Sequence, residues 1–185
     1  MGSIEGWSLA LSPIKEDAWS EADLAVLVQA YSTLLFRVAH SILRNPAEAE
    51  DVVQDVFVRV LQHRRSLPAV RDLRVWLVRI AWNLALDRTR RVRPEQWDEL
   101  FIESLAGSNL PADQAMQETQ RMQSVLRELE RLPKPERHAL LLSAIDELGT
   151  AEIAEVMGRS ESAVRALLFR ARTRLKDRLE KGERR

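Results

Sequence analysis

Apolar residues recur with helical spacing along most of the chain. Two such stripes lie between residues 24 and 62, and Asn45-Pro46 separates them because the residue before a proline avoids helical backbone angles. A third stripe covers residues 73–91, and each stripe predicts a helix with one buried face. The expected inward positions are Leu24, Leu27, Val28, Tyr31, Leu34, Leu35, Val38 and Ile42 in the first helix, Val52, Val56, Phe57, Val60 and Leu61 in the second, and Trp76, Leu77, Ile80, Leu84 and Ala85 in the third.

A segment rich in turn-forming residues follows the third helix. Pro94 stops this helix, and the segment that follows favours a linker because it contains Gly107, Ser108, Asn109 and Pro111. Helical spacing then resumes. The expected helices cover residues 117–131, 134–148, 150–157 and 160–179, and Gly149 is expected to be the C-terminal cap of the second of these.

These patterns predict an all-α fold with two small helical domains joined by a flexible linker, because we find neither strand-like alternation nor an internal repeat. The expected division is an N-terminal tail over residues 1–23, a first domain over 24–93, a linker over 94–116 and a second domain over 117–185.

The composition excludes several classes of protein. Of 185 residues, 45% are hydrophobic and 30% are charged, which is typical of a globular chain. The absence of cysteine excludes disulfides, thiol nucleophiles and thiolate metal sites. There is no charged-then-apolar leader and no apolar run long enough to cross a bilayer. We therefore expect a cytoplasmic protein without membrane insertion.

The formal net charge is zero, but the charges are segregated. Acidic residues gather at 48–55 and 98–103, and basic residues gather at 88–93 and from 165 onward. Phosphate contacts act over about 8–10 Å in physiological salt, so local positive potential decides nucleic-acid binding. The charge distribution is therefore compatible with a DNA-binding surface.

The strongest local motif lies at residues 150–165. Gly158 suits a left-handed turn between two helices, and Ser160 suits the N-cap of the second. A helix-turn-helix of this kind places the start of its second helix in the DNA major groove. A plain helical hairpin with solvated arginines remains the alternative. The candidate DNA-binding residues are Ser160, Ser162, Ala163, Arg165, Ala166, Phe169, Arg170 and Arg172, with Arg174 and Lys176 extending the basic flank.

One side of the second helix carries Asp51, Gln54, Asp55 and Val58, which the predicted core does not need. This side is either solvated or docks a basic helical partner, and composition does not distinguish the two.

The third helix has a different outward side. Trp82 and Asn83 precede a basic run, which fits single-strand recognition because aromatic rings stack on bases and amides bind base edges. The alternative is that Trp82 is half-buried against the second domain or the linker. The outward positions are Arg79, Trp82, Asn83 and Leu86, followed by Arg88, Arg90 and Arg91.

Together these stretches resemble the extracytoplasmic-function (ECF) sigma factors of bacterial RNA polymerase over about residues 24–180. AEDVVQDVFVRV resembles the sigma-2 helix that binds the clamp helices of the polymerase largest subunit, which implies this role for Asp51, Gln54 and Asp55. LPKPERHALLL and TAEIAEVMGRSESAVRALLFRARTRL resemble the sigma-4 domain, whose recognition helix binds the −35 element.

LRVWLVRIAWNLALDRTRR resembles the family's helix that melts and binds the −10 element on the non-template strand. The resemblance implies that Trp76, Arg79 and Asn83 face that strand, and that the loop over residues 64–74 forms a pocket for a flipped base. This chain departs from the family at Trp82, where members often carry arginine, and at Ala163-Val-Arg-Ala-Leu in the recognition helix. These departures affect base preference.

The resemblance implies an alternative sigma factor that binds core polymerase through the clamp helices and the flap region. Its other expected partners are duplex −35 DNA, single-stranded −10 DNA and an anti-sigma factor that wedges between the two domains. No cofactor and no metal are expected.

Two other classes of function compete with a sigma factor. A helix-turn-helix regulator that does not bind polymerase shares the C-terminal pattern but leaves AEDVVQD and WNLALD unexplained. An enzyme is disfavoured because His40, His63 and His138 are scattered and neither a metal-ligand spacing nor a phosphate-binding loop occurs.

Overall fold

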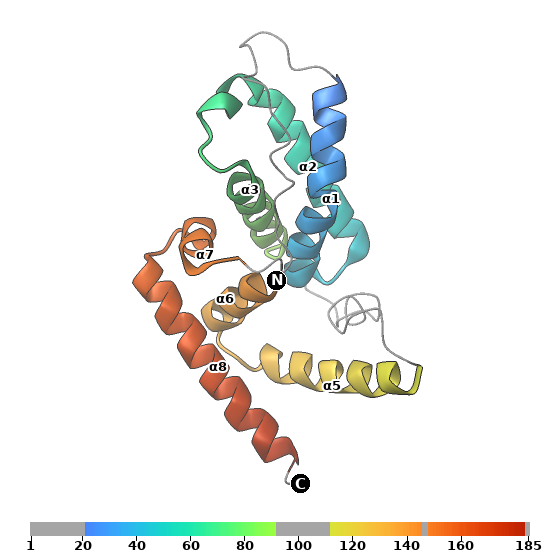
Figure 1. Ribbon diagram of the computed structural model, residues 1–185, viewed down its shortest axis with the longest axis vertical. Coiled ribbons are helices and arrows are strands. Elements are labelled where there is room, and N and C mark those ends of the chain that lie inside the picture. The colour runs from blue at the N-terminus through green and yellow to red at the C-terminus, as the bar shows by residue number, and fades with distance from the viewer. Residues whose placement is uncertain (1–20, 92–111, 146–147, 184–185) are drawn as a thin grey trace, which may run out of the picture.

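The computed structural model describes residues 21–91, 112–145 and 148–183, and within them every regular element is helical (Figure 1), which confirms the all-α fold. Residues 94–111 of the predicted linker and residues 1–20 of the predicted tail, with Trp7 and Trp19, lie outside the described residues, and the rest of both segments belongs to helices. The elements are α1 Glu21–Leu43, α2 Pro46–Gln62, a 3-10 helix Arg64–Ala69, α3 Leu73–Arg88, α5 Ala112–Glu130, α6 Lys134–Ala144, α7 Thr150–Met157 and α8 Glu161–Glu183.

The first module, α1 to α3, has helix boundaries that local chemistry explains. Asn45 caps α2 because its side chain accepts a hydrogen bond from the Glu48 backbone N–H at 3.0 Å, and Pro46 begins the helix. Asp72 caps α3 in the same way by accepting from the Val75 N–H at 3.0 Å. These two caps place the starts of α2 and α3 close to their expected positions.

Helix α1 is long and apolar enough to cross a membrane by length and composition, over Asp23–Leu43. The core helix of a globular protein passes the same test. In this structure α1 packs against both α2 and α3, and its Leu35 and Val38 are fully buried. This packing accounts for the apolar residues on the buried side of α1, while Val26 and Val28 of the same helix remain exposed.

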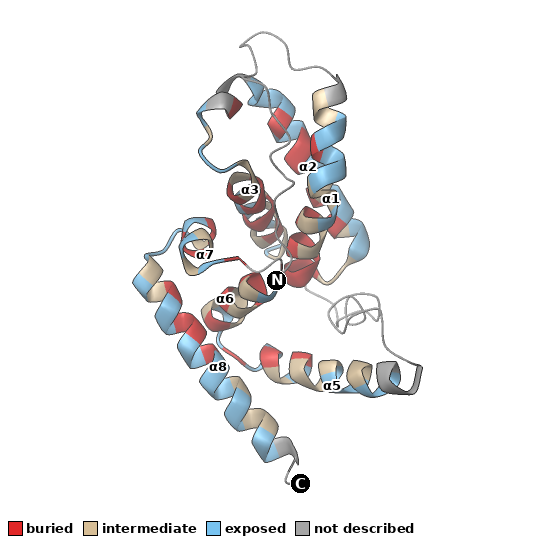
Figure 2. Cartoon of the chain, viewed as in Figure 1, coloured by how far each residue is buried: buried red, intermediate tan, exposed pale blue. Residues whose placement is uncertain are grey.

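Helix α3 is buried on more than one side, which differs from the predicted single stripe. Leu77 and Ala85 are buried as expected, but so are Val75 and Trp82, while Trp76 is only half-buried. The reason is that α1 and α2 cover one side of α3 and the C-terminal module covers another, and Figure 2 shows buried residues along its length. Two other expected inward positions, Val28 and Leu61, are exposed.

The second module, α5 to α8, corrects two boundaries. Helix α5 begins at Ala112 and not at residue 117. Helix α6 ends at Ala144, so Gly149 is not its C-terminal cap; Gly149 precedes α7, and its N–H donates to Glu152 Oε2 at 2.7 Å. A small cluster of Leu126, Leu129, Leu132, Leu141 and Ala171 joins α5, α6 and α8.

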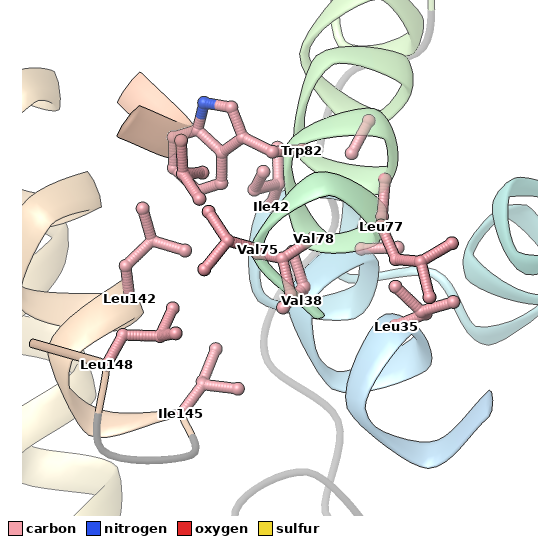
Figure 3. Packing of buried hydrophobic residues seen from close by; sticks show 14 of the residues in the cluster. Leu35, Val38, Ile42, Val75, Leu77, Val78, Trp82, Leu142, Ile145 and Leu148 are labelled. Atoms are coloured by element: carbon pink, nitrogen blue, oxygen red, sulfur yellow. The ribbon is translucent and has the colours of Figure 1, made fainter. Parts of the chain in front are cut away.

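A single hydrophobic core joins the two modules. It continues from Val38 and Val78 in the first module to Leu142, Ile145 and Leu148 in the second. Figure 3 shows Val75 and Trp82 of α3 between these two groups. Burial of apolar surface is the main favourable contribution to packing, so this shared core holds the C-terminal module against α3.

Candidate nucleic-acid interface

Helices α7 and α8 form the predicted helix-turn-helix. Gly158 has φ 63°, a left-handed conformation that glycine adopts without the cost paid by other residues. Ser160 Oγ accepts a hydrogen bond from the Ala163 N–H at 3.2 Å, which is an N-cap for α8. Val164 and Leu168 are buried, so the turn fixes which face of α8 remains outside.

That outer face carries the predicted DNA-binding residues. Phe169 is 72% exposed, and Arg165 is exposed although its guanidinium pairs with Glu161 at 2.9 Å. A surface hollow of about 330 Å³ lies over this face and is lined in part by Thr150, Phe169 and Lys176. Of the remaining predicted residues, Ala163 is half-buried and Ser160, Ser162, Ala166, Arg170 and Arg172 are exposed.

Sequence reasoning missed the contact that holds α8 on α6. Glu136 is 4% exposed, and its carboxylate accepts from Arg170 Nε at 3.1 Å and from Arg174 at 2.9 Å. The sequence predicts both arginines on the DNA side; each remains about half exposed there and also anchors the recognition helix to α6. A glutamate in the first turn of a short helix gave no sign of burial, because that position is ordinarily solvated.

The acidic side of α2 is exposed at Asp51, Gln54, Asp55 and Val58, as expected from the pattern. Arg88 at the end of α3 crosses to this side. Its guanidinium donates to Asp55 Oδ2 at 2.7 Å and to Glu48 Oε2 at 2.8 Å, and Asp51 Oδ2 lies 3.5 Å away. The structure thus brings predicted polymerase-binding and predicted DNA-binding residues into direct contact.

The rest of the predicted −10 surface divides in two. Arg79, Asn83, Arg90 and Arg91 are exposed. Trp82 is 2% exposed and lies against the second module, which is the alternative that its position in the sequence left open.

Trp82 is one of several residues that make contacts across the module boundary. Its indole meets the His138 ring edge to face, and Arg74 pairs with Glu152 at 2.9 Å. Farther along, Arg44 pairs with Glu130 at 2.7 Å. Burial lowers the pKa of His138 to about 4, and the neighbouring charges of Arg137 and Lys134 act in the same direction. His138 is therefore neutral at pH 7.

In the part of the chain that the structure describes, no group of histidine, aspartate or glutamate side chains could hold a metal ion.

Comparisons with known proteins agree with this geometry. The chain matches the family model Sigma-70 region 2 over residues 27–95 and Sigma-70, region 4 over residues 122–175. The RNA polymerase sigma factor YlaC of Bacillus subtilis (strain 168) is 32% identical, covering 80% of this chain and 84% of that protein. The ECF RNA polymerase sigma factor SigM of the same organism is 30% identical, covering 84% of this chain and 94% of that protein.

Two solved structures are also similar. The structure of CnrH in complex with the cytosolic domain of CnrY has a TM-score of 0.64 at 28% identity, covering 88% of this chain and 90% of that one. The sigma factor RpoE from Bartonella quintana, in complex with the anti-sigma factor NepR, has a TM-score of 0.61, covering 85% and 97%. At 19% identity this second likeness shows the fold alone.

Proposed function

Because the chain belongs to the ECF family of RNA polymerase sigma factors, and is thus a polymerase-binding alternative sigma factor, we propose that it directs core polymerase to specific promoters and opens the DNA there. The observation that carries this proposal is that one chain contains both a capped helix-turn-helix with an exposed α8 face and a region 2 module. The family is a non-catalytic initiation factor, and we propose that this chain likewise makes and breaks no bond.

We assign −35 recognition to the outer face of α8. A recognition helix enters the major groove with its N-terminal residues leading, and the Ser160 cap leaves that end of α8 at the surface. Arg165 suits guanine O6 and N7, and Phe169 suits the methyl group of thymine. Ser160, Ser162, Ala163, Ala166 and the Arg170 and Arg172 flank complete the assigned surface.

We assign polymerase docking to the acidic side of α2. Asp51, Gln54, Asp55 and Val58 are exposed together, and two carboxylates with an apolar neighbour suit a basic helical partner such as the clamp helices. We further propose that the region 4 module contacts the flap region of polymerase.

We assign −10 recognition to α3. Arg79, Asn83, Arg90 and Arg91 are exposed and suit the backbone and base edges of an unpaired strand. Trp76 is half-buried and belongs to the same assigned surface, whereas Trp82 can meet bases only if the C-terminal module moves away from α3, since Trp82 is buried beneath it. We therefore propose that separation of the modules precedes promoter opening.

The expected protein partner is an anti-sigma factor. The similar structures of CnrH and of RpoE hold CnrY and the anti-sigma factor NepR respectively. An inhibitor that stabilised the packed arrangement would keep α3 covered. The proposed location is the cytoplasm, where polymerase and promoter DNA are.

Run-off transcription tests the proposal. Purified core polymerase with this protein, on fragmented DNA from its source genome, should give discrete transcripts that polymerase alone does not give. Their start sites would define the −35 and −10 sequences. Specific duplex binding without transcripts, once an inhibitor and a mismatched polymerase had been excluded, would favour the helix-turn-helix regulator.

A further inference from the structure

The arginines at the end of α3, Arg88 and Arg90, face different surroundings. The side chain of Arg90 is 83% exposed, whereas that of Arg88 is 24% exposed and is directed at α2. The Arg88 guanidinium donates hydrogen bonds to Glu48 and Asp55, and it also lies close to Asp51. Its position is therefore poor for a phosphate and good for a carboxylate cluster.

The three acids share one side of α2 because they are spaced by three and four residues. Arg88 reaches them from the α3 side, and its Nη1 also lies 3.4 Å from the Glu48 backbone carbonyl. The side chains of Asp51 and Asp55 remain 59% and 50% exposed, so each keeps oxygen surface for a partner. A planar guanidinium can hold two carboxylates at once, which a lysine ammonium does less well.

We propose that Arg88 is a positioning residue for polymerase docking, which holds Asp51 and Asp55 in their docking orientation, and that it does not bind the −10 strand. This inference rests on the assignment of docking to the acidic side of α2.

Arg88 keeps its positive charge beside these acids. Burial by itself would lower the pKa of Arg88, but the hydrogen bonds to Asp55 and Glu48 outweigh burial and raise it. Arg88 therefore stays cationic and bridges the acids at any pH where they are ionised. Fixing two carboxylate side chains before binding removes an entropic cost that polymerase binding would otherwise carry.

Positioning and simple neutralisation make opposite predictions. Removing Arg88 leaves the acidic side more negative, which by itself would attract a basic partner more strongly. If Arg88 positions the acids, its removal weakens docking in spite of the added negative charge. The sign of the change therefore distinguishes the two roles.

The test measures the affinity of the full chain for core polymerase and, separately, the binding of a −10 fork-junction DNA by the assembled holoenzyme. Arg88→Gln should weaken polymerase binding about tenfold, as expected for losing the orientation of two side chains, and should leave DNA binding within about twofold. Arg88→Lys keeps the charge but holds one acid at a time, so its affinity should be intermediate. Arg90→Gln removes the same charge two residues away and should show the reverse pattern.

Unchanged or tighter polymerase binding by Arg88→Gln would overturn the inference, as would a loss confined to the DNA step. Arg88→Lys decides the matter if Arg88→Gln folds poorly in circular dichroism, since wild-type affinity in Arg88→Lys overturns the bridging role. If the unaltered chain does not bind core polymerase at all, the proposed function fails and this inference fails with it.

Discussion

The indole of Trp82 and the imidazole of His138 meet edge to face across the two modules, with ring centroids 5.1 Å apart and ring planes at 89°. Trp82 belongs to the helix assigned to the −10 strand, and His138 belongs to α6, the helix to which the recognition helix α8 is anchored through Glu136. Edge-to-face pairs add about 0.5–1.5 kcal/mol to the burial of their surface. This contact therefore links the state of one promoter-binding module to the position of the other.

The half-buried His138 should make stability depend on pH. Its folded pKa is about 4, below the usual 6.5, so the unfolded chain binds a proton over the interval in which the folded chain does not. The stabilisation is complete above about pH 6.5 and is lost as pH falls toward 4. Between pH 7 and pH 5 the loss from this group should be about 2 kcal/mol.

Denaturant unfolding at both pH values checks this expectation. His138→Phe keeps a ring against Trp82 but has no proton to bind, so it should lose less stability on acidification than the unaltered chain. Equal losses would show that His138 does not carry the pH dependence.

Reversing the charge of Arg74 should favour separation of the modules. Arg74→Glu places two carboxylates together at Glu152, where an ion pair now spans the boundary at 2.9 Å. The pair is about one-third exposed on each side, so its contribution is about 0–1 kcal/mol and the shift should be partial. Small-angle scattering should give a larger radius of gyration for the variant. Arg71→Glu makes the same charge change at an exposed position and should leave the radius unaltered.

Neutralising Glu136 should loosen α8. Glu136→Gln loses the charge that accepts from Arg170 and Arg174, and we expect a loss of about 1–3 kcal/mol in the free energy of unfolding. The two arginines are about half exposed and can return to water, which keeps the loss below that of a fully buried pair. Arg170→Gln should cost less because Arg174 remains on the carboxylate. A larger loss from Arg170→Gln than from Glu136→Gln would contradict this order.

The turn of the helix-turn-helix should depend on Gly158. At φ 63° an alanine costs about 1–2 kcal/mol, although its added Cβ would meet nothing within 4 Å. The midpoint of thermal unfolding should fall by several degrees. Gly149→Ala is the matched control, because Gly149 has φ −70° and its Cβ would sit 3.4 Å from the Glu152 carboxylate, an ordinary contact. Similar shifts for both variants would remove the left-handed conformation as the cause.

Asn83 should act at strand capture. Asn83→Ala in the holoenzyme should reduce promoter opening by about tenfold, measured by permanganate reactivity of unpaired thymines, because a bidentate amide contact with a base edge is worth about 1–3 kcal/mol. Initial duplex binding should change little, since that step is assigned to α8. Gln62→Ala removes an exposed amide at the end of α2 and serves as the control. An equal loss in both steps would count against strand capture by Asn83.

The sequence by itself determined most of the helices and the helix-turn-helix. Caps at Asn45 and Ser160, the proline at position 46 and the left-handed Gly158 act within one or two turns of the chain, so their signals are local and can be recognised from spacing. The error at Gly149 shows the limit of this approach. A glycine after a helical stripe suits either a C-terminal cap or an N-terminal cap, and only the path of the following residues decides which forms.

Tertiary structure decided which partner each long side chain meets. Periodicity identifies one apolar face of a helix, but α3 is covered on two sides, and so Trp82 is buried where the pattern favoured an outward position. The same holds for charge, because a basic run looks uniform in sequence. The packing of α3 on α2 directs Arg88 toward the acids of α2 while Arg90 remains exposed. The packing of α8 on α6 brings Arg170 and Arg174 into ion pairs with Glu136. These contacts join residues far apart in the chain, and their geometry exists only once the helices have packed.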